Sequence, residues 1–316
     1  MRLSGTRSRT LADTLLDRTV LPGYSRIGYA LRSRSWEPIP RIDGRSVLVT
    51  GASAGIGAAA ASAFAALGAR VHVLGRDPER TEQARSTAGA ARAWSCDLSS
   101  LRAVREFARR FRDEERDLHV LVNNAGVLMQ ERRLSPDGNE LALATNVLGP
   151  FLLTGLLAPA LAAAAPARLI NVSSGGMYTQ RVAVDDLQSA RGYDGAAVYA
   201  RHKRAQVILT ELWAERLDAR GIKAHSMHPG WVDTPGLERS LPRFRSVLRP
   251  LLRTPAQGAD TIVWLGAAAE PAECTGRFWH DRAERPTHVL RRTRETPEER
   301  RRLWNECVRL TGLELE

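Results

Sequence analysis

The chain has 316 residues, 43% of them hydrophobic and 26% charged, a globular composition that excludes a disordered chain and permits a sizeable buried core. Its formal net charge is +11, and nearly all of the positive charge is arginine, since Lys203 and Lys223 are its two lysines. No nucleic-acid-binding motif accompanies this charge, so we expect no nucleic-acid partner.

The excess of arginine is concentrated at the two ends of the chain, in residues 1–45 and 281–302. Acidic residues interleave with these arginines, which favours a solvated surface, and a peripheral membrane-facing surface is the alternative that stays open. Cys96, Cys274 and Cys307 are widely spaced and form no CxxC pair. This spacing predicts free thiols in a reducing compartment, and hence a cytoplasmic protein.

Residues 1–40 are predicted to form an amphipathic N-terminal extension. Apolar residues alternate with arginines, and Pro22 with Gly23 divides the stretch, so two short amphipathic helices are expected. The segment "WEPIPRIDG" then leads into one domain at 41–316, whose last part, 277–316, is predicted to be a C-terminal arm.

From residue 46 onward, short apolar runs alternate with helical patterns. Strands are predicted in "SVLVTG", "ARVHVLG", "DLHVLVNNAG", "ARLINVSS", "IKAHSMHPG" and, as a last edge strand, "CTGRFWH". Helices are predicted after the first run up to Leu67, and at 101–116, 140–163 and 199–219. The most apolar stretch, 149–165, is interrupted by a proline and is shorter than a membrane span, so a buried helix is expected. The predicted fold class is therefore α/β, a single Rossmann-type doubly wound parallel sheet with helices on both faces.

The first turn of this pattern reads "TGASAGIG", and it places Gly51, Gly55 and Gly57 between a strand and a helix. Glycine there permits a tight turn, a close approach of backbone to a pyrophosphate, and close packing of helix on strand. The helix N-terminus also offers N–H groups to phosphate oxygens. The strand–loop–helix context predicts a dinucleotide site rather than a glycine-rich turn without a ligand.

The end of the second strand, "VHVLGRD", bears on which dinucleotide is preferred. An acidic residue at the strand tip would bind the adenosine ribose and favour NAD, but Gly75 is expected at the tip and Arg76 follows it. A guanidinium binds a 2′-phosphate with a fork of paired hydrogen bonds. A register shifted by two residues would instead place Asp77 at the tip. We predict NADP(H) in preference to NAD(H).

Six motifs occur in one order along the chain: "TGASAGIG", "NNAG", "TNVLGP", "NVSS", "YARHK" and "HPGWVDT". Together they resemble the short-chain dehydrogenase/reductase family over about residues 46–276. The segments "VAVDDLQ" and "TPAQGADTIVWLGAA" resemble its retinol-dehydrogenase-like branch. The resemblance implies an oxidoreductase that transfers hydride between NADP(H) and the carbonyl or alcohol carbon of a lipophilic substrate. It also implies a homo-oligomer, although the segments at both ends would cover the usual interfaces.

The proton-transfer chemistry is predicted at Tyr199 and Lys203, which share one face of the predicted helix. A phenol has a pKa of about 10, and a nearby cation lowers it, which suits Tyr199 to act as acid and base. The resemblance adds hydrogen bonds from Lys203 to the nicotinamide ribose. It also implies that Ser174 orients the substrate oxygen, with Ser173 as the alternative, and that Asn146 positions a water for a proton relay.

The remaining cofactor contacts are implied by the resemblance, with Asp97 at the adenine and Thr234 at the nicotinamide carboxamide. The full predicted set of cofactor-binding residues is Gly51, Ser53, Gly55, Ile56, Gly57, Arg76, Asp97, Leu98, Asn124, Ala125, Gly126, Tyr199, Lys203, Pro229, Gly230, Val232 and Thr234. We expect no metal site, because His202, His225 and His228 match no metal-ligand spacing.

The segment 235–255 is predicted to cover the substrate pocket. Its leucines, phenylalanine, valine and prolines favour an apolar carbonyl or alcohol as substrate. Its five arginines are expected to face solvent, to receive an anionic tail, or to contact a membrane surface. A non-catalytic NADP(H)-binding redox sensor or scaffold is the alternative function, and such a protein has no need of Ser174, Tyr199 and Lys203.

Overall fold

The computed structural model describes residues 19–314, with 1–18 and 315–316 outside the description. Its strands form one sheet in the order β3-β2-β1-β4-β5-β6-β7-β8. Neighbouring strands are parallel from β3 to β7, and β8 is antiparallel to β7. The chain therefore starts at β1 in the middle of the sheet, adds β2 and β3 on one side of it, and then adds β4 and the later strands on the other side. Doubly wound folds bind ligands at this switch point between β1 and β4.

The strands are β1 (Ser46–Thr50), β2 (Arg70–Gly75), β3 (Arg92–Ser95), β4 (Val120–Asn123), β5 (Ala167–Val172), β6 (Ile222–Met227), β7 (Arg277–His280) and β8 (Ala283–Glu284). The central strands β1, β4 and β5 are buried throughout, as expected for parallel strands covered on both faces. The sequence did not predict β3, whose four residues "RAWS" lack an apolar run, or the two-residue β8. Because β8 pairs with β7, the expected edge position of β7 was wrong.

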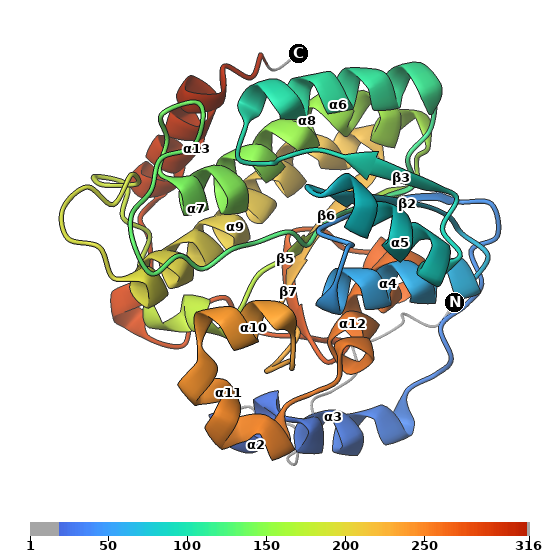
Figure 1. The fold of residues 1–316 in the computed structure, drawn as a ribbon, viewed down its shortest axis with the longest axis horizontal. Helices are drawn as coiled ribbons and strands as arrows, with labels where there is room; N and C mark the ends of the chain where they lie inside the picture. The colour runs from blue at the N-terminus through green and yellow to red at the C-terminus, as the bar shows by residue number, and fades with distance from the viewer. Residues whose placement is uncertain (1–18, 315–316) are drawn as a thin grey trace.

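The helices before the domain and around its first half are α2 (Val20–Tyr24), α3 (Arg26–Arg32), α4 (Gly55–Ala66), α5 (Pro78–Ala88) and α6 (Leu101–Glu114). Those of the second half are α7 (Leu141–Leu143), the π-helical turn η2 (Ala144–Leu148), α8 (Gly149–Ala163), α9 (Gly195–Leu217), α10 (Pro235–Ser240), α11 (Pro242–Leu248), α12 (Pro255–Ala267) and α13 (Pro297–Thr311). Helices α4, α5 and α12 cover one face of the sheet, and α6, α8 and α9 cover the other (Figure 1). The predicted doubly wound architecture is confirmed.

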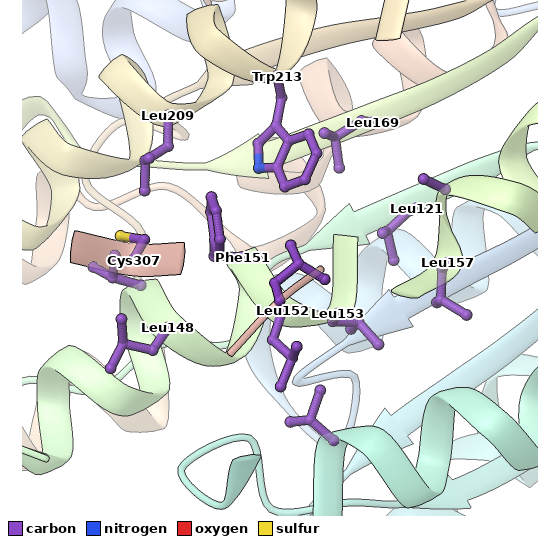
Figure 2. Close-up of a cluster of buried hydrophobic side chains, with 14 of the residues drawn as sticks. Leu121, Leu148, Phe151, Leu152, Leu153, Leu157, Leu169, Leu209, Trp213 and Cys307 are labelled. Carbon is purple, nitrogen blue, oxygen red and sulfur yellow. The ribbon is translucent and has the colours of Figure 1, made fainter. Parts of the chain in front are cut away.

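The most apolar stretch forms α8, which is packed inside the protein. Phe151 of this helix lies 5.2 Å from Trp213 and 5.0 Å from Trp304 between ring centroids, and leucines surround the cluster (Figure 2). By length and composition the helical run 141–163 could cross a membrane, yet 78% of its most apolar window is buried. The prediction of a buried helix is confirmed.

The described part of the N-terminal extension, helices α2 and α3, packs on the domain beside α11 (Figure 1). The two helices meet at Ser25, whose side chain accepts a hydrogen bond from Ile27 N, and not at Pro22–Gly23 as predicted. Pro22 is accommodated because it lies in the first turn of α2, where backbone N–H groups have no helical partner. Residues 1–18 of the predicted extension lie outside the described residues.

Candidate active site

Close backbone approach shapes the glycine loop after β1. Gly51 has a φ of 65°, and a Cβ there would lie 2.8 Å from the Cα of Ala125. A Cβ at Gly57 would lie 2.4 Å from the Gly51 carbonyl oxygen. Asn124 fixes this approach, since its amide donates to the Thr50 carbonyl at 2.9 Å while the Thr50 hydroxyl accepts from Ala125 N at 3.1 Å. Side chains larger than hydrogen are therefore excluded from the two glycine positions.

The N-terminus of α4 is open to an anion. Ala54 precedes the helix without a side-chain cap, and the first turn carries no acidic residue. The N–H groups of the first turn of α4 and the positive end of the helix dipole are thus available to a phosphate. The backbone of the glycine loop fits a group of this kind. A cavity of about 250 Å³ beside the loop is lined in part by Ser53 and, from α5, Arg80.

The tip of β2 has no room for an acidic side chain. Gly75 is the last residue of the strand, and a Cβ there would lie 2.2 Å from the Thr81 hydroxyl oxygen. Asp77 instead caps α5, where its carboxylate accepts from Arg80 N at 3.0 Å. The alternative register that the sequence left open is thereby excluded, and Arg76 stands exposed beside the tip.

Ser174, Tyr199 and Lys203 come together at the carboxyl ends of the strands. Lys203 Nζ lies 5.4 Å from the centroid of the Tyr199 ring on the same face of α9. Burial raises the pKa of Tyr199 to about 12, and a side-chain hydrogen bond with Ser174 opposes that rise. The expectation that Lys203 lowers this pKa below about 10 was therefore wrong, because burial of the phenol outweighs the other effects. Ser173 points elsewhere, since its hydroxyl donates to the Lys203 carbonyl oxygen at 2.8 Å. The geometry therefore favours Ser174 over Ser173 as the group beside the phenol.

Lys203 is buried, and its ammonium is held by two acceptors. Nζ donates to the Val172 carbonyl at 2.8 Å and to Gln206 Oε1 at 2.9 Å. Burial lowers the pKa of Lys203 to about 7. The other end of the Gln206 amide donates to the Asn146 carbonyl at 2.7 Å, so this side chain spans the two residues for which the resemblance implied a bridging water. The sequence signal for Gln206 was its position three residues after Lys203, on the same helix face.

Asn146 lies in the π-helical turn η2, a type of helix distortion that is frequent at functional sites. Its side-chain amide accepts from Val127 N and donates to the Val127 carbonyl, both at 2.8 Å. A Cβ at Gly126 would lie 3.4 Å from both Asn146 Oδ1 and Lys203 Nζ. The side chain thus ties the "NNAG" segment to the site, while the backbone carbonyl of Asn146 faces Gln206.

Other predicted cofactor residues lie on the segments that follow β1, β3 and β6. A Cβ at Gly55 would lie 3.3 Å from Thr234 Cγ2, so the segments after β1 and β6 face each other. Thr234 also caps α10 by accepting from Leu237 N at 3.1 Å. Asp97 accepts from Ser99 N at 2.9 Å, which fixes the turn after β3.

Some of the predicted residues serve packing in the structure. Leu98 is 6% exposed, and its carbonyl would lie 2.3 Å from a Cβ at Gly149. Ile56 of α4 and Val232, which follows β6, both pack against Gly258 of α12, since a Cβ at Gly258 would lie 3.3 Å from Ile56 Cγ1 and 2.6 Å from Val232 Cγ2. In the structure these three residues are therefore packing residues.

His202 lies next to Lys203 in the chain and is buried. Its Nε2 is 3.8 Å from a carboxylate oxygen of Glu140, which itself accepts hydrogen bonds from Ala142 N and Leu143 N at the start of α7. Burial, together with the charge of Lys203, lowers the pKa of His202 to about 3. The imidazole is therefore neutral at physiological pH.

A buried ionic network, which the sequence did not predict, stands behind the loop after β6. Asp281 accepts from Arg253 at 2.5 Å and 2.8 Å and from Arg32 of α3 at 2.8 Å. Burial alone would raise the pKa of Asp281, but the charges of Arg253 and Arg32 and the hydrogen bond from Arg253 lower it well below its usual range. Arg253 also donates to the carbonyl of Pro229 at 3.2 Å. The network thus joins the N-terminal extension to a predicted cofactor-binding residue.

Residues 45–243 match the family model described as short chain dehydrogenase. The chain is 42% identical over 292 residues to Dehydrogenase/reductase SDR family member 12 of Bos taurus, covering 89% of this chain and 91% of that protein. It is 35% identical over 284 residues to Retinol dehydrogenase 12 of Mus musculus, covering 87% and 89%. It is 38% identical over 292 residues to Polyprenol dehydrogenase of Mus musculus, covering 87% and 86%.

Solved structures share the architecture over nearly their whole length. An uncharacterised protein from Mycobacterium paratuberculosis aligns with a TM-score of 0.71 at 28% identity, covering 88% of this chain and 97% of that one. The Pseudomonas aeruginosa RhlG/NADP active-site complex aligns with a TM-score of 0.63 at 27% identity, covering 77% and 96%.

Proposed function

Because the chain belongs to the short-chain dehydrogenase/reductase family, whose retinol and polyprenol dehydrogenases are among its relatives, we propose that Tyr199 is its acid/base residue and NADP(H) its preferred cofactor. Family membership itself makes the protein an NAD(P)-dependent oxidoreductase acting on CH–OH and C=O groups. The proposed substrate is a lipophilic carbonyl or alcohol. The observation that carries the proposal is the cluster of Ser174, Tyr199 and Lys203 beside the open glycine loop.

Bound NADP(H) supplies or accepts the hydride at the substrate carbon. In the reduction direction the Tyr199 phenol, kept protonated by a pKa of about 12, donates its proton to the carbonyl oxygen. The Ser174 hydroxyl, hydrogen-bonded to that phenol, orients the same oxygen. The Lys203 ammonium stabilises the phenolate that remains, and its pKa of about 7 lets it return a proton near neutral pH. Oxidation of an alcohol runs through the reverse proton transfer.

The proposed preference for NADP(H) is supported by the charges around the β2 tip. The tip residue Gly75 has no space for the acidic side chain that would bind a free ribose. Arg76 is exposed beside it, and Arg80 with Ser53 lines the adjoining cavity. Two guanidinium groups near the glycine loop favour a ligand with an additional phosphate.

The proposed lipophilic substrate is supported by the composition of α10 and α11, which we expect to cover the site. Helices α10 and α11 carry no fully buried residue, and the rings of Phe244 and Trp231 meet edge to face at 5.3 Å. Such aromatic surface suits an apolar substrate. The names Retinol dehydrogenase 12 and Polyprenol dehydrogenase describe relatives that act on lipid alcohols, in agreement with this assignment.

A peripheral membrane contact from the cytoplasmic side is proposed for the surface beside this segment. Val20, Leu21, Ile27 and Leu31 of α2 and α3 are each about half exposed, and Val247 of α11 is 78% exposed. Arginines flank these side chains, as expected for a surface that meets anionic lipid. Failure of the protein to float with anionic vesicles at low salt would contradict this contact. The homo-oligomer stays a prediction from the resemblance.

The deciding experiment is turnover of an aldehyde and ketone panel with NADPH and with NADH. Tyr199→Phe is expected to lose at least about 10²-fold in kcat while NADPH binding persists, because the phenol proton is gone. Tyr29→Phe is the matched control, since its hydroxyl donates to Asp260 outside the site. Equal activity of Tyr199→Phe and wild type would refute the mechanism. NADPH binding by a wild-type protein that turns over nothing on the panel would favour the redox sensor.

A further inference from the structure

The ring of Tyr24, at the end of α2, lies against the residue that follows Ser174. A Cβ on Gly175 would lie 2.6 Å from Cε2 of Tyr24. Gly175 is not among the glycines with positive φ, so its backbone conformation is open to other residues. The absence of a side chain at residue 175 is therefore explained by the aromatic ring that occupies the space.

The backbone around Tyr24 is fixed from two directions. The Tyr24 carbonyl accepts from Trp231 N at 2.9 Å, and a Cβ at Gly230 would lie 2.6 Å from that carbonyl oxygen. The buried guanidinium of Arg253 donates at 3.1 Å to the carbonyls on either side, those of Gly23 and Ser25. A residue held in this way presents its ring in one orientation, as a binding wall requires.

Three aromatic groups without charge contact the ring. Tyr24 meets His228 at 4.5 Å, His280 at 5.3 Å and Trp231 at 5.9 Å between centroids, in each case edge to face. Burial lowers the pKa of His228 well below its usual value and that of His280 to about 3, so both imidazoles are neutral. The ring itself is half-buried, and none of the described residues hydrogen-bonds to its hydroxyl.

We propose that Tyr24 is a specificity-determining residue, forming a wall of the substrate site beside Ser174 on which the apolar skeleton of a carbonyl or alcohol substrate lies. The ring stands between the segment after β5, which carries Ser174, and the segment after β6, which carries Pro229 and Gly230. Substrate whose oxygen meets Ser174 and Tyr199 extends along this wall. The inference rests on the proposed function, since it places the reacting oxygen at those two residues, and it adds a contact supplied by the N-terminal extension.

The test compares kcat/KM for propanal and decanal with NADPH. Tyr24→Ala is expected to lose about 10-fold to 100-fold for decanal, mainly through KM, and less than about threefold for propanal, because a long apolar chain loses the ring it packs on. Tyr24→Phe keeps the ring and is expected to resemble wild type. Trp36→Ala is the matched control, since this aromatic residue of the same extension contacts Tyr29 and Arg282 outside the site.

Gly175→Ala provides a second, independent perturbation of the same contact. Its methyl group displaces the ring, so decanal selectivity is expected to fall as it does in Tyr24→Ala. In the double variant the alanine at 175 meets no ring, and its effect is expected to disappear. If Tyr24→Ala fails to fold, Gly175→Ala carries the same comparison.

Three outcomes overturn the proposal. Unchanged decanal-to-propanal selectivity in a folded Tyr24→Ala or Gly175→Ala would show that the ring is not a substrate wall. A lowered Tm with unchanged selectivity would show that Tyr24 acts only as a structural strut. Wild-type protein that reduces neither aldehyde, nor any other member of the carbonyl panel, would refute the proposed function and the inference together.

Discussion

The two halves of the sheet are organised by different interactions. In the half around β1 and β2, apolar side chains such as Val47, Val49 and Phe64 are fully buried, and the cofactor loop is shaped by contacts between backbone segments. In the half around β6 and β7, a buried carboxylate and two arginines join segments as far as 249 residues apart in the chain. The first half depends on a compact local motif, whereas the second is completed only when distant segments have docked.

The largest expected effect comes from breaking the network of the second half. Asp281→Asn leaves Arg32 and Arg253 buried without their carboxylate, and we expect the free energy of unfolding to fall by about 3–5 kcal/mol in urea denaturation. Asp43→Asn is the matched control, because its ion pair with Arg41 is exposed to solvent and is expected to contribute little to stability. Equal effects of the two substitutions would contradict the contrast between the halves.

This contrast also explains what the sequence predicted. The glycine loop, the parallel sheet implied by βαβ units, and the helix face shared by Tyr199 and Lys203 follow from local patterns, and the structure contains all three. The bond between Arg253 and Asp281 has no local signal, because a charge run in a sequence does not show which charges will be buried together. The sequence likewise gives no sign that Gly175 packs against Tyr24, because the two residues are far apart in the chain.

A smaller effect, confined to cofactor binding, is expected in the first half. Arg76→Ala is expected to raise the Kd for NADPH about 10-fold to 100-fold by removing a charge-assisted contact, and to leave NADH binding within about twofold. Fluorescence titration measures both constants. Arg102→Ala is the control, since this arginine pairs with Glu106 on α6. Equal weakening of NADPH and NADH binding would rule out recognition of the 2′-phosphate by Arg76.

At the junction of the halves, Gln206→Ala is expected to lower kcat about tenfold with little change in KM. Loss of one acceptor disfavours the Lys203 ammonium and lowers the pKa of Lys203 further below about 7, so the phenolate is stabilised less. The rise of alcohol oxidation with pH should therefore move to higher pH, and Gln206→Glu should move it back. A lower kcat with an unchanged pH profile would mean that Gln206 has only a packing role.

The smallest expected effect concerns pH and His72 in β2, whose pKa burial lowers to about 4. Between pH 4 and 6.5 the unfolded chain binds a proton at this site and the folded chain does not, so stability is lost as the pH falls through that window. His72→Gln, which keeps an acceptor for Trp94 Nε1, is expected to reduce this loss by about 1 kcal/mol per pH unit. Urea denaturation at pH 6.5 and 5 measures it, and identical pH dependence would contradict the assignment.

The docking of α2 and α3 has a practical consequence for producing the protein. A recombinant fragment that starts at residue 41, just before β1, would keep every family motif and lose Tyr24 together with the carbonyls of Gly23 and Ser25 that Arg253 binds. Trp231 N would lose its acceptor as well. The shortest fragment expected to keep these contacts therefore begins no later than Thr19, well before the first family motif.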